Sequence, residues 1–538
     1  MEIYRILALL LFFHVQASSL HKILIIPHGN LSHTLMLHAI GKELLNRGHE
    51  VSLLWNEEII LKDVDRYHYK KIYYSYPGSS NFTTDILTNA QEFFAEMGRR
   101  PLSVIKEHFE NKFSGRKNFY DMVLDGANLA THSILSNITL MNRLKSENFS
   151  VAIMDAFHPI SSYFLIPVNL SIPFVSVSES ISSFDMRLPF IPFTNMYGPA
   201  NNGKPGFIYR LKELLDFIGF LIVTRMTSLF PSPKIEEFGN YSKLSSFREI
   251  VEQSSLFLYM RDPFITGLYF PKLPHVEFIG GLTVSPPKNI ENPELNKLIE
   301  ESGDGIILCS FGSIISSIPK EIMENVLKAF SRLKQRVVFR FDSTYAKFKL
   351  ENVPANVKLM DWVPQNDLLA HKNMKLFISH VGTNGVYEAL YNGIPMLMYP
   401  KFQPIHIMIA NRIVNLGCGE IFDFEENESK IYHLIEHLIN NGSYKFQAQK
   451  IARILKRQKP PRIVAAEAIE NVIEFGGAHL RPEISYRLNI FEFYMLDVLL
   501  VPFTFALIFI IFISWCLFKI SKRFLIFLKK CNMKLKRD

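Results

Sequence analysis

The chain has 538 residues, and its formal net charge is +8 at pH 7. This length allows two domains that each bury a hydrophobic core. The positive charge does not indicate a nucleic-acid partner, because eight Lys or Arg residues and a single acid follow residue 518, which leaves about +1 for the rest of the chain.

Residues 1–19 predict a secretory signal peptide. Residues 6–13 form a short apolar core, and residues 15–17 fit a cleavage site. Because Glu2 offsets the charge of Arg5, an uncleaved anchor remains the alternative. In either case the segment directs the chain into the secretory pathway.

An N-terminal domain is predicted over residues 20–283. Residues 21–26 predict a strand, residues 33–46 an apolar-faced helix, and residues 51–55 a second strand. This β-α-β order indicates a doubly wound α/β domain.

The end of this domain is predicted from two further strands, at residues 256–260 and 278–282. The sequence SPPK at residues 285–288 then predicts a linker. The apolar run at residues 217–223 is too short to cross a membrane and predicts a buried or interfacial helix.

A second α/β domain is predicted over residues 290–480. It begins with a strand at residues 305–310 and a helix at residues 320–335. Gly312 and Ser313 lie in the turn between them, where they could approach a phosphate or sugar or form an ordinary strand-to-helix turn. Cys309 lies in the apolar strand, so we expect a buried thiol, and no Cys or His cluster indicates a structural metal.

A strand, glycine turn and helix at residues 375–391 predict a phosphate site. His380, Gly382, Asn384 and Gly385 form the turn, and a buried strand follows at residues 394–399. Such a turn directs backbone N–H groups and the positive end of a helix dipole at one point. The glycines let the backbone approach an anion, and the side chains of His380 and Asn384 add donors.

Three nearby side chains suit a nucleoside. Glu388 is placed to accept hydrogen bonds from ribose hydroxyls, Trp362 offers a flat stacking face, and Gln365 can read a pyrimidine edge. The alternatives are that Trp362 is a core residue and that Glu388 is a solvated helix residue.

The segments WVPQNDLLAH and FISHVGTNGVYEALYNGIP resemble the signature of the UDP-glycosyltransferases, the membrane-bound animal type that includes UDP-glucuronosyltransferases and UDP-glucosyltransferases. The resemblance implies a GT-B architecture, with two facing doubly wound Rossmann-like domains. It implies a UDP-sugar as co-substrate, no metal cofactor, and a small lipophilic acceptor. The UDP-sugar contacts that it implies are Trp362 with uracil, Gln365 with uridine, His380, Asn384 and Gly385 with the diphosphate, and Glu388 with ribose.

His33 is the predicted catalytic base and Asp155 its partner. His33 follows Ser32 at the start of the first helix, where the dipole favours the neutral imidazole that a base requires. Asp155 ends an apolar strand and would orient His33, as the aspartate of a triad does. A helix-capping role for His33 and a turn role for Asp155 are the alternatives, but both positions match the family. One displacement at the anomeric carbon then gives an inverted product.

The resemblance fails after Pro400. The family's Asp-Gln pair, which holds the sugar hydroxyls, is replaced by Ile405 and His406, and isoleucine cannot accept a hydrogen bond. Either Gln403 or another group substitutes, or the donor site is impaired. The first hypothesis is therefore an active transferase that uses glucose, galactose or glucuronate, and the alternative is a catalytically weak membrane-anchored binding protein.

The C-terminus predicts a membrane anchor. Residues 498–518 are uncharged and long enough to cross a bilayer, and the basic tail at 519–538 should remain cytoplasmic. Lys534 and Lys536 have the spacing of a dilysine signal for the endoplasmic reticulum. We thus expect a single-pass type I protein with a lumenal body, and a homo-oligomer remains open. The sequons, all on the lumenal side, are Asn30, Asn81, Asn137, Asn148, Asn169, Asn240, Asn427 and Asn441.

Overall fold

The structure is a computed structural model of the chain. It describes residues 20–27, 31–57, 69–76, 119–156, 162–178, 207, 211, 235–239, 247–267, 272–312, 318, 320–341, 348–400, 404–423, 427–481 and 488–535. The predicted signal peptide, the apolar run at 217–223, Ser313 and Gln403 lie outside these ranges. By contact density the chain forms two compact units, Met1–Arg481 and Pro482–Asp538.

The first sheet of unit 1 has seven parallel strands in the order β3-β2-β1-β4-β5-β6-β7. Alternate residues of β1 pack into two different hydrophobic clusters, so this strand is buried on both faces, as its continuous apolar run requires. The strands are β1 (Lys22–Ile26), β2 (Glu50–Asn56), β3 (Lys70–Tyr74), β4 (Val151–Asp155), β5 (Phe174–Ser178), β6 (Leu256–Tyr259) and β7 (Val276–Phe278).

The second sheet has six parallel strands in the order β10-β9-β8-β11-β12-β13. Its central strand β8 also alternates between two clusters, and Cys309 is fully buried there, as predicted. The strands are β8 (Ile306–Ser310), β9 (Arg336–Arg340), β10 (Val357–Met360), β11 (Met374–Ser379), β12 (Met396–Met398) and β13 (Gly419–Ile421). Two parallel sheets, each covered on both faces, confirm the predicted fold class.

Helices connect the strands of both sheets. The helices that lie between strands of the first sheet in the sequence are α2 (Leu31–Asn46), α5 (Phe119–Ser136), α6 (Ile138–Ser146), α7 (Leu165–Leu170), η3 (Ile235–Phe238), α9 (Phe247–Glu252) and α10 (Pro263–Thr266). Those of the later chain are α11 (Pro293–Glu300), α12 (Lys320–Ser331), α14 (Gln365–Leu369), α15 (Thr383–Tyr391), α16 (Pro404–Asn415), α17 (Glu428–Asn440), α18 (Gly442–Leu455), α19 (Pro461–Phe475) and η5 (Ala478–Leu480).

Several element boundaries differ from the prediction, and three of these differences are described here. The strand predicted at 278–282 is wrong, because β7 ends at Phe278 and a turn follows in which Gly281 has a φ of +90°. Helix α12 ends at Ser331 rather than at residue 335. Helix α15 begins at Thr383, so Asn384 and Gly385 belong to its first turn and not to the preceding loop.

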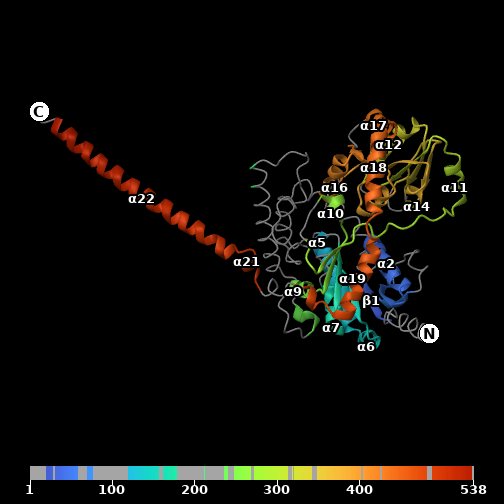
Figure 1. The fold of residues 1–538 in the computed structure, drawn as a ribbon, viewed down its shortest axis with the longest axis horizontal. Helices are drawn as coiled ribbons and strands as arrows, with labels where there is room; N and C mark the ends of the chain where they lie inside the picture. The colour runs from blue at the N-terminus through green and yellow to red at the C-terminus, as the bar shows by residue number, and fades with distance from the viewer. Residues whose placement is uncertain are drawn as a thin grey trace, which may run out of the picture. The chain divides into compact units, whose positions relative to one another are not determined.

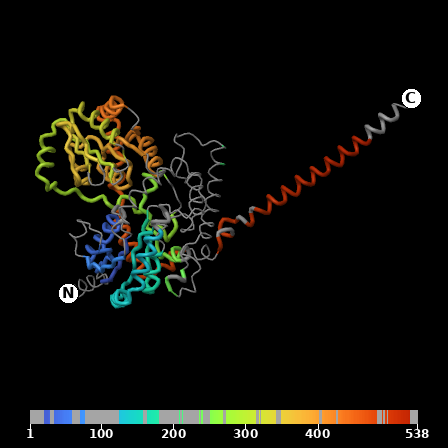
Figure 2. Tube along the Cα trace, turned by 180° about the vertical axis from the view of Figure 1, so that it is seen from behind, coloured from blue at the N-terminus to red at the C-terminus, as the bar shows by residue number. Residues whose placement is uncertain are grey.

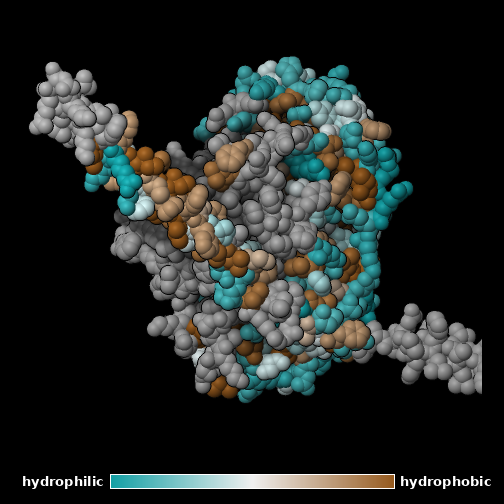
Figure 3. Space-filling model, turned by 60° about the vertical axis from the view of Figure 1, so that its left-hand side comes forward, coloured by the Kyte–Doolittle hydropathy of each residue, from teal (hydrophilic) through white to brown (hydrophobic). Residues whose placement is uncertain are grey.

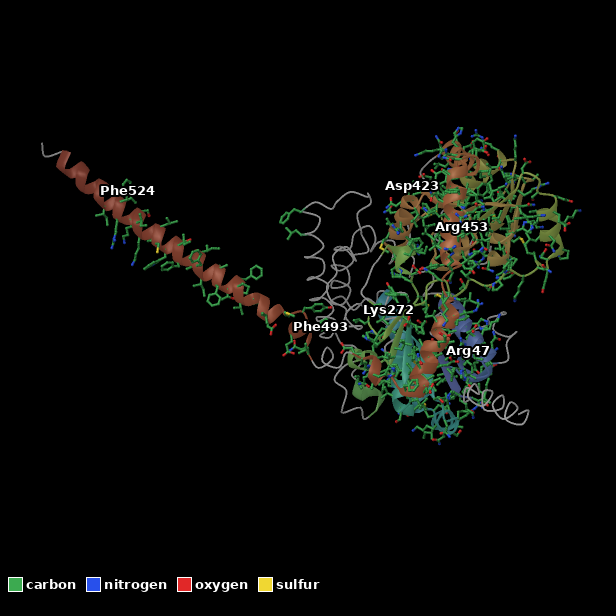
Figure 4. All side chains as sticks on the ribbon, viewed as in Figure 1. Arg47, Lys272, Asp423, Arg453, Phe493 and Phe524 are labelled. Atoms are coloured by element: carbon green, nitrogen blue, oxygen red, sulfur yellow. The ribbon has the colours of Figure 1, made fainter. Side chains whose placement is uncertain are left out.

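Helix α19 returns the chain to the first sheet, where it packs along α2 (Figures 1 and 2). Ala465, Ala466 and Ile469 enter the same hydrophobic cluster as β1. The guanidinium of Arg47, which directly follows α2 and is labelled in Figure 4, donates to Glu470 at 2.8 Å. The domain limits of 20–283 and 290–480 remain predictions, and α19 is a part of the second range that contacts the first sheet.

We expect Glu470→Ala to lower the free energy of unfolding by about 1–3 kcal/mol, because the buried ring of His49, whose Nε2 lies 3.1 Å from Glu470, loses this partner and Arg47 loses the shortest of its three ion pairs. Thermal unfolding of the full chain in detergent measures this. Glu474→Ala, on the exposed side of the same helix, is the matched control. Equal unfolding temperatures for the two variants would contradict the prediction.

Unit 2 consists of α21 (Ile490–Phe493) and the 40-residue helix α22 (Leu496–Leu535). Leu500–Ile526 is apolar and long enough to cross a membrane, and none of this stretch is buried by other parts of the chain. The surface of α22 is accordingly mostly brown in Figure 3. The helix fits the predicted anchor, although the apolar stretch runs past residue 518.

Candidate active site

The turn between β11 and α15 presents the first turn of a helix without a side-chain cap. Gly382 is the N-cap residue and has no side chain to accept from the first backbone N–H groups. Before it, Val381 is fully buried with a φ of +70°, a conformation that a β-branched residue rarely adopts. Such strain concentrates at functional sites. The turn therefore exposes uncapped helix donors suited to an anion.

The ring of His380 lies between two glycines. A Cβ atom at Gly312 would stand 2.9 Å from its Cε1, and one at Gly382 would stand 2.5 Å from its Nε2. Burial lowers the pKa of His380 to about 4, although a hydrogen bond with the backbone of Ser310 acts in the opposite direction. The imidazole is therefore neutral at physiological pH, and it can donate only one N–H.

His406, the third residue of α16, lies beside His380. Its ring centroid is 5.6 Å from that of His380, and the side chain is 5% exposed. Burial holds its pKa well below the usual range, and His380 and Arg261 add to this effect. Among the described residues its Nδ1 has no hydrogen-bond partner. Ile405, in contrast, packs into the core of the second sheet and offers no polar atom to a ligand.

Arg261 also reaches this group, and sequence reasoning missed it. It follows the carboxyl end of β6, is only 6% exposed, and donates from Nη1 to the hydroxyl of Tyr259 at 3.4 Å. No described acid pairs with it, and its Nε lacks a partner. A charged residue directly after an apolar strand was the available signal, since polar groups at strand ends face the ligand side of such sheets.

Glu388 and Gln365 form a buried pair. The amide Nε2 of Gln365 donates to Oε2 of Glu388 at 2.7 Å, and Glu388 is 7% exposed. Burial raises the pKa of Glu388 to about 7, while the hydrogen bond from Gln365 lowers it. Glu388 is thus no solvated helix residue, and its carboxyl group changes charge near neutral pH.

Trp362 is not a core residue either. Its side chain is 57% exposed at the end of β10, and an open pocket of about 560 Å³ lies beside it. Phe341, Lys349 and Met360 are among the other residues that line this pocket. An exposed indole leaves a ring face free for stacking.

His33 and Asp155 lie after or at the carboxyl ends of two adjacent strands of the first sheet, β1 and β4. Asp155 is the last residue of β4 and is 2% exposed. His33 lies in the first turn of α2, which follows β1, and β1 pairs with β4 in parallel. The topology therefore brings both positions to one edge of the sheet, although the side chain of His33 is outside the described part of the chain.

Comparison with known proteins gives consistent matches over nearly the whole chain. A sequence model of the family described as "UDP-glucoronosyl and UDP-glucosyl transferase" matches residues 21–536. Human UDP-glucuronosyltransferase 2B10 is 30% identical over 511 residues, which cover 92% of each chain. UDP-glucuronosyltransferase 1-2 of Rattus norvegicus is 28% identical over 510 residues, 92% of this chain and 90% of the relative.

Solved structures agree on the fold. The crystal structure of CalG4, the calicheamicin glycosyltransferase, superposes with a TM-score of 0.54 at 16% identity and covers 85% of this chain and 99% of its own. The glycotransferase of kitacinnamycin gives a TM-score of 0.55 at 16% identity, over 84% of this chain and 99% of its own. At this identity the likeness establishes the GT-B fold alone.

Proposed function

The chain belongs to the UDP-glucuronosyl and UDP-glucosyl transferase family and is a UDP-sugar transferase; we propose that it moves a glucuronosyl group to a hydroxyl of a small lipophilic acceptor, with inversion at the anomeric carbon. The observation that carries the proposal is the buried Arg261, with which no acid of the described residues pairs, beside His406 and the uncapped start of α15.

The nucleotide half of the site follows from the second sheet. Trp362 stacks on uracil, and Gln365 contacts the uridine and holds Glu388, which accepts hydrogen bonds from the ribose hydroxyls. The diphosphate lies at the first turn of α15, where Asn384 and Gly385 are, and against His380. Gly312 leaves the space that the His380 ring occupies. This arrangement neutralises phosphate charge with helix N–H groups, and no metal ion is assigned a role.

The transfer itself uses groups of the first sheet. The acceptor oxygen attacks the anomeric carbon while the bond from that carbon to the β-phosphate oxygen of UDP breaks. His33 takes the acceptor proton as the bond forms, and Asp155 stabilises the resulting imidazolium. The electron pair leaves with UDP, whose new negative charge lies at the start of α15. A single displacement of this kind inverts the anomeric configuration.

The choice of the sugar donor is inferred from the positive charge of the buried Arg261 guanidinium. A guanidinium that is buried without an acid costs free energy unless a ligand supplies the anion. The carboxylate of glucuronate is such an anion, whereas glucose and galactose carry none, and the relatives named above are glucuronosyltransferases. His406 stands at the family's glutamine position, next to Arg261, and adds a donor for a sugar oxygen.

This assignment predicts a change of donor preference. We expect Arg261→Leu to lower kcat/KM for UDP-glucuronate about tenfold, because one charge-assisted hydrogen bond is lost, and to leave kcat/KM for UDP-glucose within about twofold. UDP release measured with both donors decides this. Arg457→Leu, at an exposed arginine in the turn after α18, is the matched control. An equal loss with both donors would overturn the assignment.

We also propose a single-pass type I topology, with the catalytic body in the lumen of the endoplasmic reticulum. The apolar stretch of α22 and the basic residues behind it support this orientation. The acceptor is then a phenol, sterol or other lipophile that an apolar pocket near the bilayer can take up.

A further inference from the structure

One tyrosine of α15 reaches the segment that carries Arg261. The hydroxyl of Tyr387 accepts the backbone N–H of Asp262 at 2.6 Å, and the side chain is 3% exposed. Gly280 makes room for this contact, because a Cβ atom there would stand 2.4 Å from the hydroxyl and 2.5 Å from the Asp262 nitrogen. The contact joins residues that are 125 positions apart in the sequence.

A second contact holds the same segment from α16. Nε of Arg412 donates to the backbone oxygen of Phe264 at 3.2 Å, and its guanidinium lies 5.8 Å from the centroid of the Phe264 ring. Between these two points the Asp262 side chain caps α10, accepting from the N–H of Phe264 at 2.7 Å. The backbone directly after Arg261 is therefore fixed to helices of the second sheet.

This placement links two parts of the donor site. Tyr387 precedes Glu388 on α15, so neighbouring residues of one helix carry the proposed ribose acceptor and the hydroxyl that holds Asp262. Arg261 precedes Asp262, and its charge acts on both Tyr387 and His406. A shift of the Asp262 backbone would move the Arg261 guanidinium relative to the site.

We propose that Tyr387 is a positioning residue: its hydroxyl fixes the Asp262 backbone against α15 and thereby holds the Arg261 guanidinium at the sugar end of the bound donor. The proposal rests on the function proposed above, since it assigns to Arg261 a contact with the sugar. The nucleotide end of the donor needs only α15 and its neighbours. Loss of the Tyr387 hydroxyl therefore affects sugar recognition and spares the affinity for UDP.

The test is Tyr387→Phe in the full-length protein, which removes one oxygen and keeps the ring. We expect kcat/KM for UDP-glucuronate to fall about tenfold, and kcat/KM for UDP-glucose and the affinity for UDP to stay within about twofold. Tyr391→Phe is the matched control, because this half-buried tyrosine lies one turn later on the same helix, where its ring lies 5.1 Å from the ammonium of Lys456.

A double variant separates positioning from a general structural role. If Tyr387 acts through Arg261, its substitution has no further effect on UDP-glucuronate use in an Arg261→Leu background. If the losses of kcat/KM in Tyr387→Phe and Arg261→Leu add in the double variant, or if Tyr387→Phe lowers kcat/KM equally with both donors, the coupling is overturned while the donor assignment stands. If Arg261→Leu alone leaves UDP-glucuronate use unchanged, the donor assignment and the coupling both fail.

Discussion

His33→Ala is expected to reduce kcat by about 10²- to 10⁴-fold, the usual contribution of a general base. The affinity for UDP should change less than about twofold, because the proposed UDP contacts belong to the second sheet. Initial rates of product formation and calorimetric titration with UDP measure the two quantities on one preparation. Asp155→Asn should cause a smaller loss of kcat, since this residue acts through His33.

His38→Gln serves as the control for this experiment. His38 lies on the same helix, and its Nδ1 is 2.9 Å from the hydroxyl of Tyr69, a partner that glutamine can keep. We expect activity within about twofold of the wild type. If His38→Gln abolishes transfer and His33→Ala does not, the base has been assigned to the wrong histidine.

Glu388→Ala is expected to weaken UDP binding by about 100-fold. The carboxylate is proposed to accept from both ribose hydroxyls, and two charge-assisted hydrogen bonds contribute about 3–6 kcal/mol before the cost of desolvation. The variant also removes the acceptor of the Gln365 amide, which is buried beside it. Calorimetry with UDP measures the loss, and wild-type affinity in the variant would contradict the ribose assignment.

The pKa of Glu388 also predicts that the affinity for the nucleotide depends on pH. In the free protein its pKa is raised to about 7, so the carboxyl group is largely protonated at pH 6 and ionised at pH 8. Ribose hydroxyls stabilise the ionised form, so binding lowers the pKa and affinity rises with pH. We expect UDP-glucose to bind about tenfold more tightly at pH 8 than at pH 6, and Glu388→Gln to remove this dependence. His380 and His406 stay neutral over this range, because burial lowers both of their pKa values.

Much of the fold could be predicted because its strands are buried on both faces. Continuous apolar runs at β1, β4 and β8 have the length and composition of parallel strands, and the polar residues that end β4 and β8, Asp155 and Ser310, indicate the ligand edge. The start of α15 was less predictable. Gly385 is a poor helix former, and it indicated a loop where the structure has the first helical turn.

The site residues that sequence reasoning missed depend on contacts between distant segments. Glu388 was predicted as a site residue, but its burial was not, because helix α15 is buried from Val386 to Leu390 and has no polar face that would distinguish a buried acid. The proposed role of Arg261 depends on its proximity to Tyr387 and His406, which lie more than 120 positions away in the sequence. Such juxtapositions follow from how two sheets are packed, and local patterns do not contain them.

The central claim is that this chain transfers a sugar from a UDP-sugar with His33 as the base. The most direct test is UDP release in microsomes that contain the chain, with UDP-glucuronate, UDP-glucose or UDP-galactose and a pool of phenols and sterols, for the wild type and His33→Ala. We predict release that is fastest with UDP-glucuronate and is lost in the variant. Tight binding of UDP without His33-dependent release from any of the three donors would contradict the claim and favour a membrane-anchored binding protein.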